Sequence, residues 1–256
     1  MIIEKKIPRV VMALPCYNEA KNLPDLLKNF ELLNNSHAES FLTEVLIIDD
    51  CSTDNTQEVL SPWRDKQWIQ IITHQSNKGL TGGINTSFNE FSKSLKQVNP
   101  PVAYALMDGD NSHTPTHIPS MLEKIKNGDD IVVASRYQIG SKTIGVSWIR
   151  QILSCGLAML FKLFRNIPGV RDYSCGYRMY SPQIVKTLKA RFPNEVVLEP
   201  SFASMVEILV KCHLLGAKCS EVPMLLRYDL KLGESKMPFK QTIIGNFKLL
   251  RTLKRV

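Results

Sequence analysis

The sequence predicts an α/β fold in which a mostly parallel central sheet is flanked by helices. Short runs of β-branched and apolar residues alternate with helical patterns through the first half of the chain. The 256 residues are enough to bury a sizeable core, and their composition indicates neither disorder nor a fibrous repeat. Polar residues follow several of the strands, at the edge where parallel sheets bind ligands. One α/β domain is therefore expected.

The elements follow one another in βα order as far as residue 135. Strands are predicted over residues 10–14, 45–48, 69–73, 102–106 and 131–134, with helices over residues 21–33, 81–95 and 116–126. Pro115 stands near the first turn of the last helix, where proline is tolerated. The pattern then changes to a basic, apolar helical stretch over 148–164, a turn and short strand over 172–180, and two further helices.

Composition narrows the classes of partner. The net charge of +8 and the pI of about 9.2 favour an anionic partner, such as a nucleotide diphosphate, an acidic membrane surface or nucleic acid. The basic residues are spread out without a known nucleic-acid-binding pattern, so we expect no nucleic-acid partner. The six cysteines form no CxxC pair, which indicates reduced thiols in the cytoplasm. The longest uncharged run, residues 151–161, falls short of the roughly 18 apolar residues of a membrane span.

Two aspartates directly follow the fourth predicted strand, in Asp108-Gly109-Asp110. Carboxylates at the end of a buried strand are costly unless a cation pairs with them. Mg²⁺ or Mn²⁺ accepts one or two carboxylates and completes its shell with phosphate oxygens and water, and Gly109 leaves room for a ligand. The alternative is an ordinary turn. The motif predicts a metal site that neutralises a diphosphate leaving group.

Polar residues also follow the first two strands, in the segments PCYNEA and DDCSTD. A nucleoside needs an aromatic or apolar face with a few fixed hydrogen-bond partners, and a carboxylate commonly holds the ribose. Tyr17, Glu19 and Asp50 suit these roles. Asn18 and Ser52 could instead merely cap helices, as such residues often do.

Seven segments, taken together, resemble the family 2 glycosyltransferases, whose catalytic domain has the GT-A fold. They are PCYNEAKNL, VLIIDDCSTDNT, NKGLTGGIN, LMDGDNSHTP, ASRY, DYSCGYRMYS and LRYDLKLGESK. Within the family they look most like the dolichyl- and polyprenyl-phosphate sugar transferases. The resemblance, which spans about residues 10–236, implies inverting transfer from a nucleotide-sugar, usually GDP-mannose, UDP-glucose or a relative, with Mg²⁺ or Mn²⁺ as cofactor.

The resemblance also implies site roles. The nucleotide-binding positions would be Pro15, Tyr17, Asn18, Glu19, Asp49, Asp50, Ser52, Lys78, Gly79, Asp108 and Gly109. The metal would be held by Asp108 and Asp110. The groups that meet phosphates or the acceptor would be Arg136, Asp172, Arg227, Ser235 and Lys236, to which Arg150 is added from its place at the start of the next helical stretch. The residues assigned to catalysis are Asp108, Asp110, Arg136 and Glu207. Arg136 and Arg150 could each equally be solvated surface arginines.

Two departures from the family pattern leave details open. Ser112 stands where the polyprenyl-phosphate enzymes often have a metal-binding Gln, so a third protein ligand is not assigned. The spacing from Arg227 to the GESK segment is longer than in the simplest members, which loosens the alignment of Arg227. Glu207 is matched by an acidic residue in the family and could orient an arginine, act as a base or be exposed.

The acceptor decides whether the reaction needs a base. A hydroxyl acceptor must lose a proton as it attacks, whereas a lipid phosphate is already anionic near neutral pH. Only Asp172 and Glu207 are candidate bases, against several candidate basic groups. The sequence therefore favours a phosphate acceptor.

The C-terminal segment, residues 239–256, is predicted to form a basic amphipathic helix, because apolar residues recur at helical spacing beside a stripe of Lys and Arg. Together with residues 148–164 it predicts peripheral attachment to the cytosolic face of a membrane. Alternatively, both segments bury their apolar faces in the protein core or a dimer contact, so a homo-oligomer stays open.

These observations predict a catalytic domain over residues 1–238, with a nucleotide-binding half (1–135) and an acceptor half (136–238), followed by the helix over 239–256. The expected activity is inverting transfer of a hexose from a GDP- or UDP-sugar to a polyprenyl or dolichyl phosphate, in cell-envelope or glycan biosynthesis. One alternative is a family 2 enzyme that acts on a sugar hydroxyl of a glycolipid or polysaccharide. Another is a non-catalytic nucleotide-sugar-binding module.

Overall fold

The computed structural model of the protein describes residues 7–148, 156, 161–163, 166–233, 244–246 and 249. The strands are β1 (Arg9–Cys16), β2 (Leu42–Asp49), β3 (Ile69–Thr73), β4 (Ala103–Leu106), β5 (Ile131–Ser135), β6 (Lys142–Ile144), β7 (Arg178–Tyr180), β8 (Cys219–Pro223) and β9 (Leu225–Arg227). The α-helices are α1 (Leu23–Ser36), α2 (Thr56–Leu60), α3 (Gly79–Ser94), α4 (Ile118–Lys126), α6 (Pro182–Arg191) and α7 (Ser204–Leu214). Short 3₁₀ helices cover Ser61–Trp63, Pro115–His117 and Tyr228–Leu230.

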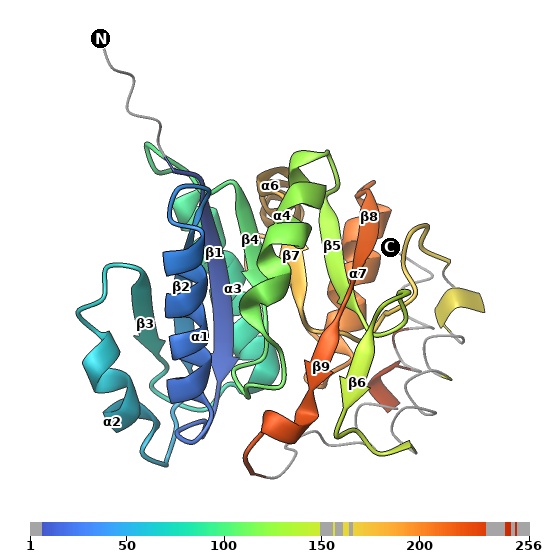
Figure 1. The fold of residues 1–256 in the computed structure, drawn as a ribbon. Helices are drawn as coiled ribbons and strands as arrows, with labels where there is room; N and C mark the ends of the chain where they lie inside the picture. The colour runs from blue at the N-terminus through green and yellow to red at the C-terminus, as the bar shows by residue number, and fades with distance from the viewer. Residues whose placement is uncertain are drawn as a thin grey trace.

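A seven-stranded sheet in the order β3-β2-β1-β4-β7-β5-β8 forms the centre, and β6 pairs with β9 in a small second sheet. Helices α1 and α4 lie on one face of the large sheet, and α3, α6 and α7 lie on the other (Figure 1). Every pair in the large sheet is parallel except those of β7, which runs antiparallel to both β4 and β5. The carboxyl ends of β1, β2, β4 and β5 therefore share one edge.

The strands form where the sequence offers continuous apolar runs. Every residue of β4 and of β5 is buried, because helices cover both faces of the sheet at these strands. Between them, β7 places Arg178 fully inside the core, where its guanidinium donates hydrogen bonds to the backbone carbonyls of Tyr173 and Met205. These bonds satisfy a charge that would otherwise be costly to bury.

The α/β prediction is confirmed. The five strands predicted before residue 135 correspond to β1–β5. The helices predicted over residues 21–33, 81–95 and 116–126 correspond to α1, α3 and α4, and the two further helices correspond to α6 and α7. The turn and short strand predicted over 172–180 are confirmed, with β7 as the strand. Among the strands and α-helices of the described residues, α2, β6, β8 and β9 were not predicted. Each has five residues or fewer, too few to show a clear hydrophobic period.

Several sequence predictions fall outside the described residues. They concern Arg150, Ser235 and Lys236, most of the helical stretch 148–164, and most of the segment 239–256. Among the described residues, no helix combines the length and apolar character needed to cross a bilayer.

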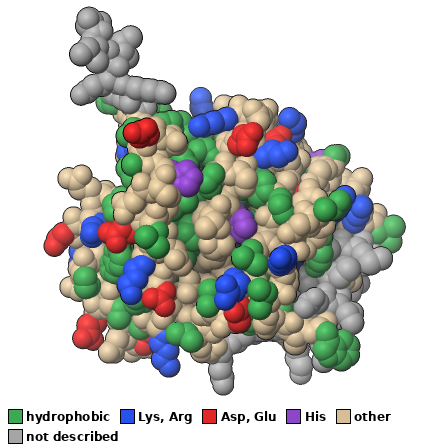
Figure 2. All heavy atoms as spheres, viewed as in Figure 1, with side chains coloured by type: hydrophobic (Ala, Val, Ile, Leu, Met, Phe, Trp, Pro, Cys, Tyr) green, Lys and Arg blue, Asp and Glu red, His purple; other side chains and the backbone are tan. Residues whose placement is uncertain are grey.

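Positive charge is not gathered on the face shown in Figure 2. Lys and Arg side chains lie scattered there among Asp and Glu side chains. An anionic ligand approaching this face would therefore meet particular side chains and not a broad basic patch.

Candidate functional site

The loops after β1 and β2 are tied together by Asn18. Its backbone adopts the left-handed region, with φ of 55°, and its backbone N–H donates to the Ser52 hydroxyl at 2.9 Å. Its side-chain oxygen accepts from the backbone N–H groups of Thr53 and Asp54 at 2.7 and 3.3 Å. Asn18 and Ser52 thus join the two loops instead of capping helices, and hold them beside each other at the sheet edge.

The two aspartates at the end of β2 are both engaged within the protein. Asp49 is fully buried and accepts hydrogen bonds from Ser52 and from the side chain of Gln57. The Asp50 carboxylate accepts from the backbone N–H groups of Lys78 and Gly79 at 2.8 and 2.7 Å, and Nδ1 of His74 lies 2.6 Å from it. Both aspartates therefore shape the loops of the expected nucleotide site; direct contact with a nucleoside stays a prediction.

Asp50→Ala should remove three contacts that hold the turn before α3. Because hydrogen bonds to charged groups contribute about 1.5–3 kcal/mol each, we expect a loss of a few kcal/mol in the free energy of unfolding. We also expect weaker binding of UDP and GDP, measured by calorimetry. Unchanged stability and nucleotide affinity would show that the turn forms without Asp50.

The end of β1 is closely packed by the neighbouring loops. A Cβ added at Gly83, in the first turns of α3, would lie 2.8 Å from Cβ of Pro15, and one added at Gly109 would lie 3.1 Å from Cβ of Cys16. Glu19 is buried and accepts a hydrogen bond from Asn22 at 2.6 Å, while Tyr17 is partly buried. A side chain in place of the glycine between the two aspartates would therefore crowd Cys16 at the end of β1.

Asp108 and Asp110 lie together at the carboxyl end of β4. Burial, and then the negative charge of Asp110, raise the pKa of Asp108 to about 7. Burial alone would also raise the pKa of Asp110, but the Lys231 ammonium group, with Nζ 2.6 Å from Oδ2, lowers it below its usual value. Asp110 accepts further hydrogen bonds from the backbone N–H and hydroxyl of Ser112, at 3.0 and 2.5 Å.

This pair of carboxylates fits a divalent cation. Two acidic side chains lie buried near each other, and a cation between them would offset the repulsion between their charges. Nearby, Nδ1 of the buried His113 has no hydrogen-bond partner among the described residues, and burial lowers the pKa of His113 to about 4. No group of three or more His, Cys, Asp and Glu side chains within the described ranges is arranged as a metal cage.

A second charged group follows β5. Arg136 forms a two-pronged ion pair with Asp172, with Nε 2.8 Å from Oδ2 and one terminal nitrogen 2.6 Å from Oδ1. The same guanidinium donates to the Ser174 hydroxyl at 2.8 Å. The Asp172 side chain is fully buried, whereas that of Arg136 stays 23% exposed. Asp172 therefore fixes the arginine, and the arginine is the member of the pair that can meet a ligand.

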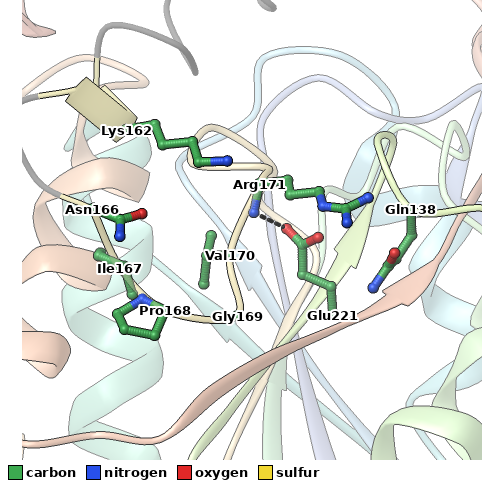
Figure 3. Close-up of a pocket in the computed structure, with 9 residues that line it drawn as sticks. All are labelled: Gln138, Lys162, Asn166, Ile167, Pro168, Gly169, Val170, Arg171 and Glu221. Carbon is green, nitrogen blue, oxygen red and sulfur yellow. Dashed lines mark hydrogen bonds between the residues drawn. The ribbon is translucent and has the colours of Figure 1, made fainter.

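Glu221 of β8 holds the backbone of the segment that carries Asp172. Its Oε1 accepts from the backbone N–H groups of Arg171 and Asp172, both at 2.7 Å. The carboxylate also lines a cavity of about 390 Å³ between β8 and the segment 166–171, with Lys162 and Gln138 at its sides (Figure 3). Burial raises the pKa of Glu221. The sequence did not mark this residue, because an acid in a five-residue edge strand carries no pattern of its own.

His113 links the two charged groups. Its pKa is influenced, after burial, by the negative charge of Asp110 and by the positive charge of Arg136. The aspartate pair after β4 and the arginine after β5 therefore lie within electrostatic reach of the same imidazole. That Asp108, Asp110, Arg136 and Asp172 form one ligand site stays a prediction.

Arg227 and Glu207 differ from the rest. Arg227, at the end of β9, pairs through its guanidinium with the neighbouring Asp229 at 2.8 Å, and its backbone N–H donates to the carbonyl of Ser112 at 2.9 Å. Glu207 is buried in α7, where Nζ of Lys211 lies 2.6 Å from it and the N–H of Glu199 donates to it at 2.8 Å. The alternative that Glu207 is exposed is therefore wrong, and its observed partners are a lysine and the backbone, not an arginine.

Glu207→Gln should act on stability and not on transfer. The change leaves the buried Lys211 ammonium group without its anionic partner, and breaking a buried pair costs about 3–5 kcal/mol. We expect a fall of that order, or somewhat less because the amide oxygen still accepts, in chemical denaturation. The kcat value should stay close to that of the wild type. A large fall in kcat with unchanged stability would instead assign Glu207 to the chemistry.

Comparison with known proteins identifies the family. The family model for glycosyl transferase family 2 matches residues 12–189. This chain belongs to that family. It is 30% identical over 250 residues to a dolichol-phosphate mannosyltransferase of Pyrococcus furiosus, covering 97% of this chain and 63% of that protein. An undecaprenyl-phosphate mannosyltransferase of Micrococcus luteus is 26% identical over 90% of this chain and 87% of its own length. The resemblance predicted from the motifs is therefore confirmed.

Solved structures support the fold. Glucosyl-3-phosphoglycerate synthase from Mycobacterium tuberculosis, crystallised with Mn²⁺, UDP and phosphoglyceric acid, matches with a TM-score of 0.65 and 14% identity. The match covers 97% of this chain and 78% of that one. The GT-A fold expected from the motifs is thus confirmed. The glycosyltransferase chain described here spans less than two thirds of the Pyrococcus relative, 63% of its length.

Proposed function

We propose that this protein transfers a hexose, with inversion, from a GDP- or UDP-sugar to a polyprenyl or dolichyl phosphate. The state of the two candidate bases carries the proposal. Asp172 is fully buried against Arg136, and Glu207 is buried against Lys211, so neither carboxylate is free to accept a proton from a hydroxyl acceptor. An acceptor phosphate needs no base, and it needs the cation that Asp172 holds in place.

On the donor side, Asp108 and Asp110 would hold Mg²⁺ or Mn²⁺. The ion would supply neutralisation of the charge that develops on the leaving diphosphate. Asn18 and Ser52 hold the β1 and β2 loops together, and Asp50 fixes the turn at Lys78 and Gly79. These loops would form the nucleoside pocket with Tyr17 and Glu19.

On the acceptor side, Arg136 would bind the lipid phosphate. One edge of its planar guanidinium donates hydrogen bonds to Asp172 and Ser174, and the remaining exposed part can donate to phosphate oxygens. Fixing the arginine in advance lowers the entropy lost when the phosphate binds. The charges of Asp110 and Arg136 both act on the buried imidazole of His113.

Names of relatives support the same substrates. The Pyrococcus and Micrococcus proteins are named for mannosyl transfer to dolichol phosphate and undecaprenyl phosphate, and mannose is therefore the first sugar to test. The experiment is incubation of the purified chain with Mn²⁺ or Mg²⁺, a panel of nucleotide-sugars and polyprenyl phosphate, with product masses as the readout. A hexosyl polyprenyl phosphate is expected. Absence of both transfer and donor hydrolysis would favour the non-catalytic binding module.

With a lipid acceptor, the protein would work peripherally at the cytosolic face of a membrane. The full chain should bind anionic vesicles, and binding should weaken with salt, because each Lys or Arg near an anionic surface contributes on the order of 1 kcal/mol. Deletion of residues 239–256 should reduce binding in a co-sedimentation assay. No binding by the full chain at low salt would contradict this part of the proposal.

A further inference from the structure

The segment that follows β9 crosses the carboxyl edge of the sheet close to the aspartate pair. We call residues 228–232 the strap. It begins with the 3₁₀ helix Tyr228–Leu230, which lies below β9 in Figure 1. The strap lies inside the segment LRYDLKLGESK, between Arg227 and the GESK residues. The sequence alone assigned no role to Lys231, so the contacts of this residue are known only from the structure.

Both ends of the strap are anchored by hydrogen bonds. At its start, the backbone N–H of Arg227 donates to the carbonyl of Ser112, two residues after Asp110. At its end, the N–H of Leu232 donates to Oδ1 of Asn22 at 2.8 Å, and Nδ2 of Asn22 donates back to the carbonyl of Leu232 at 3.1 Å. The strap thus joins the loop after β4 to the residue that precedes α1.

Between these anchors, the strap positions the side chain of Lys231 against the aspartate pair. Nζ of Lys231 lies 2.6 Å from Oδ2 of Asp110, and the two side chains are each only 12% exposed. The Tyr228 ring lies beneath the ammonium group, 5.3 Å from ring centroid to nitrogen. Carboxylates of Asp108 and Glu19 are within electrostatic reach of the same cluster.

We propose that Lys231 is a built-in counter-ion that is exchanged during donor binding. In the absence of donor, Lys231 neutralises Asp110 and keeps the strap closed against it. When the donor binds with its divalent ion, the ion pair between Lys231 and Asp110 breaks. Asp110 would then bind the ion, and Lys231 would bind the diphosphate oxygens. This inference rests on the proposed function, and it adds a donor-phosphate contact that the sequence alone did not assign.

Charge balance supports the exchange. Among the described residues, the acidic side chains of Glu19, Asp108 and Asp110 lie within electrostatic reach of one another or of Lys231. A divalent cation and the Lys231 ammonium group cannot both lie against the same oxygen of Asp110 without repulsion. The donor diphosphate brings new anionic oxygens to the same place, which gives the displaced ammonium group a partner of higher charge.

The exchange predicts opposite effects of one substitution on two binding constants. Lys231→Met keeps the length and apolar stem of the side chain and removes only its charge. For Mn²⁺ alone, followed by electron paramagnetic resonance, the variant should bind on the order of tenfold more tightly, because one neighbouring charge changes the cation affinity of a carboxylate by that factor or more. For Mn²⁺ with UDP or GDP, the variant should bind the nucleotide about tenfold more weakly.

Two controls make the result specific. Lys218→Met removes a lysine that is paired with Asp129 at 2.9 Å in the loop before β5, away from the carboxyl edge, and should change neither constant. Lys231→Arg keeps the charge, so its affinities for Mn²⁺ alone and for nucleotide with Mn²⁺ should stay close to those of the wild type. Equal Mn²⁺ and nucleotide affinities for wild type and Lys231→Met would overturn the exchange while leaving the proposed function in place. Failure of wild type and variant alike to bind Mn²⁺, with or without nucleotide, would remove the metal site and the exchange with it.

Discussion

Asp110→Asn should lower the kcat of hexosyl transfer by about a thousandfold, the upper range for removing one group that stabilises transition-state charge. The substitution keeps the size of the side chain and an oxygen that can accept from Ser112, so the local turn should survive. It removes the charge on which the divalent ion depends. Steady-state kinetics with saturating Mg²⁺ or Mn²⁺ measures the effect.

The matched control is Asp129→Asn. Asp129 is also buried and also pairs with a lysine, at 2.9 Å, but it precedes β5 at the opposite edge of the sheet. The Asp129→Asn variant should lose some stability and no more than a small part of its transfer activity. Thermal melting of both variants separates unfolding from lost chemistry. Near-normal turnover of Asp110→Asn would contradict the assignment of the aspartate pair.

Arg136→Ala should reduce both transfer and stability. The sequence left open that Arg136 is a solvated surface arginine, whose loss would cost little stability, but the structure shows it paired with the fully buried Asp172. Removing the arginine leaves a buried carboxylate without a partner, which costs about 3–5 kcal/mol. The KM for polyprenyl phosphate should rise, while the affinity for the nucleotide should change little.

A double variant separates the two effects. In Arg136→Ala with Asp172→Asn, the unpaired charge is gone, so part of the stability should return while transfer stays low. Arg191→Ala, at the exposed end of α6 and beside the Phe192 ring, is the surface control and should change neither property. Full activity of the double variant would show that Arg136 does not meet the acceptor.

Much of the fold was predictable because its strands are long apolar runs separated by helical periods. The runs that become β1, β2 and β4 end in polar motifs, and parallel pairing forces those ends to one edge, so the positions of Asn18, Asp50 and Asp110 followed from the order of elements. The short strands β6, β8 and β9 did not follow. Three to five residues show no period, and their pairing depends on tertiary contacts.

The site was predictable in its residue types and less so in its pairings. The sequence placed Arg136 and Asp172 in the acceptor half, but it could not show that one fixes the other, since 36 positions separate them. Lys231 carried no signal, because a lysine in a polar loop is ordinarily a solvated side chain. Its position on Asp110 depends on the Asn22 and Ser112 anchors, which lie far from it along the chain.

The most direct test of the central claim compares two acceptors of equal chain length, polyprenyl phosphate and polyprenol, with GDP-mannose, UDP-glucose and related donors in the presence of Mn²⁺. Mass spectrometry of the lipid products is the readout. A hexosyl phosphodiester formed from the phosphate, and no product from the alcohol, is the predicted result, because Asp172 and Glu207, the two carboxylates that the sequence offered as bases, are held in buried ion pairs. Transfer to the alcohol, or to a glycolipid hydroxyl, with none to the phosphate would contradict the account.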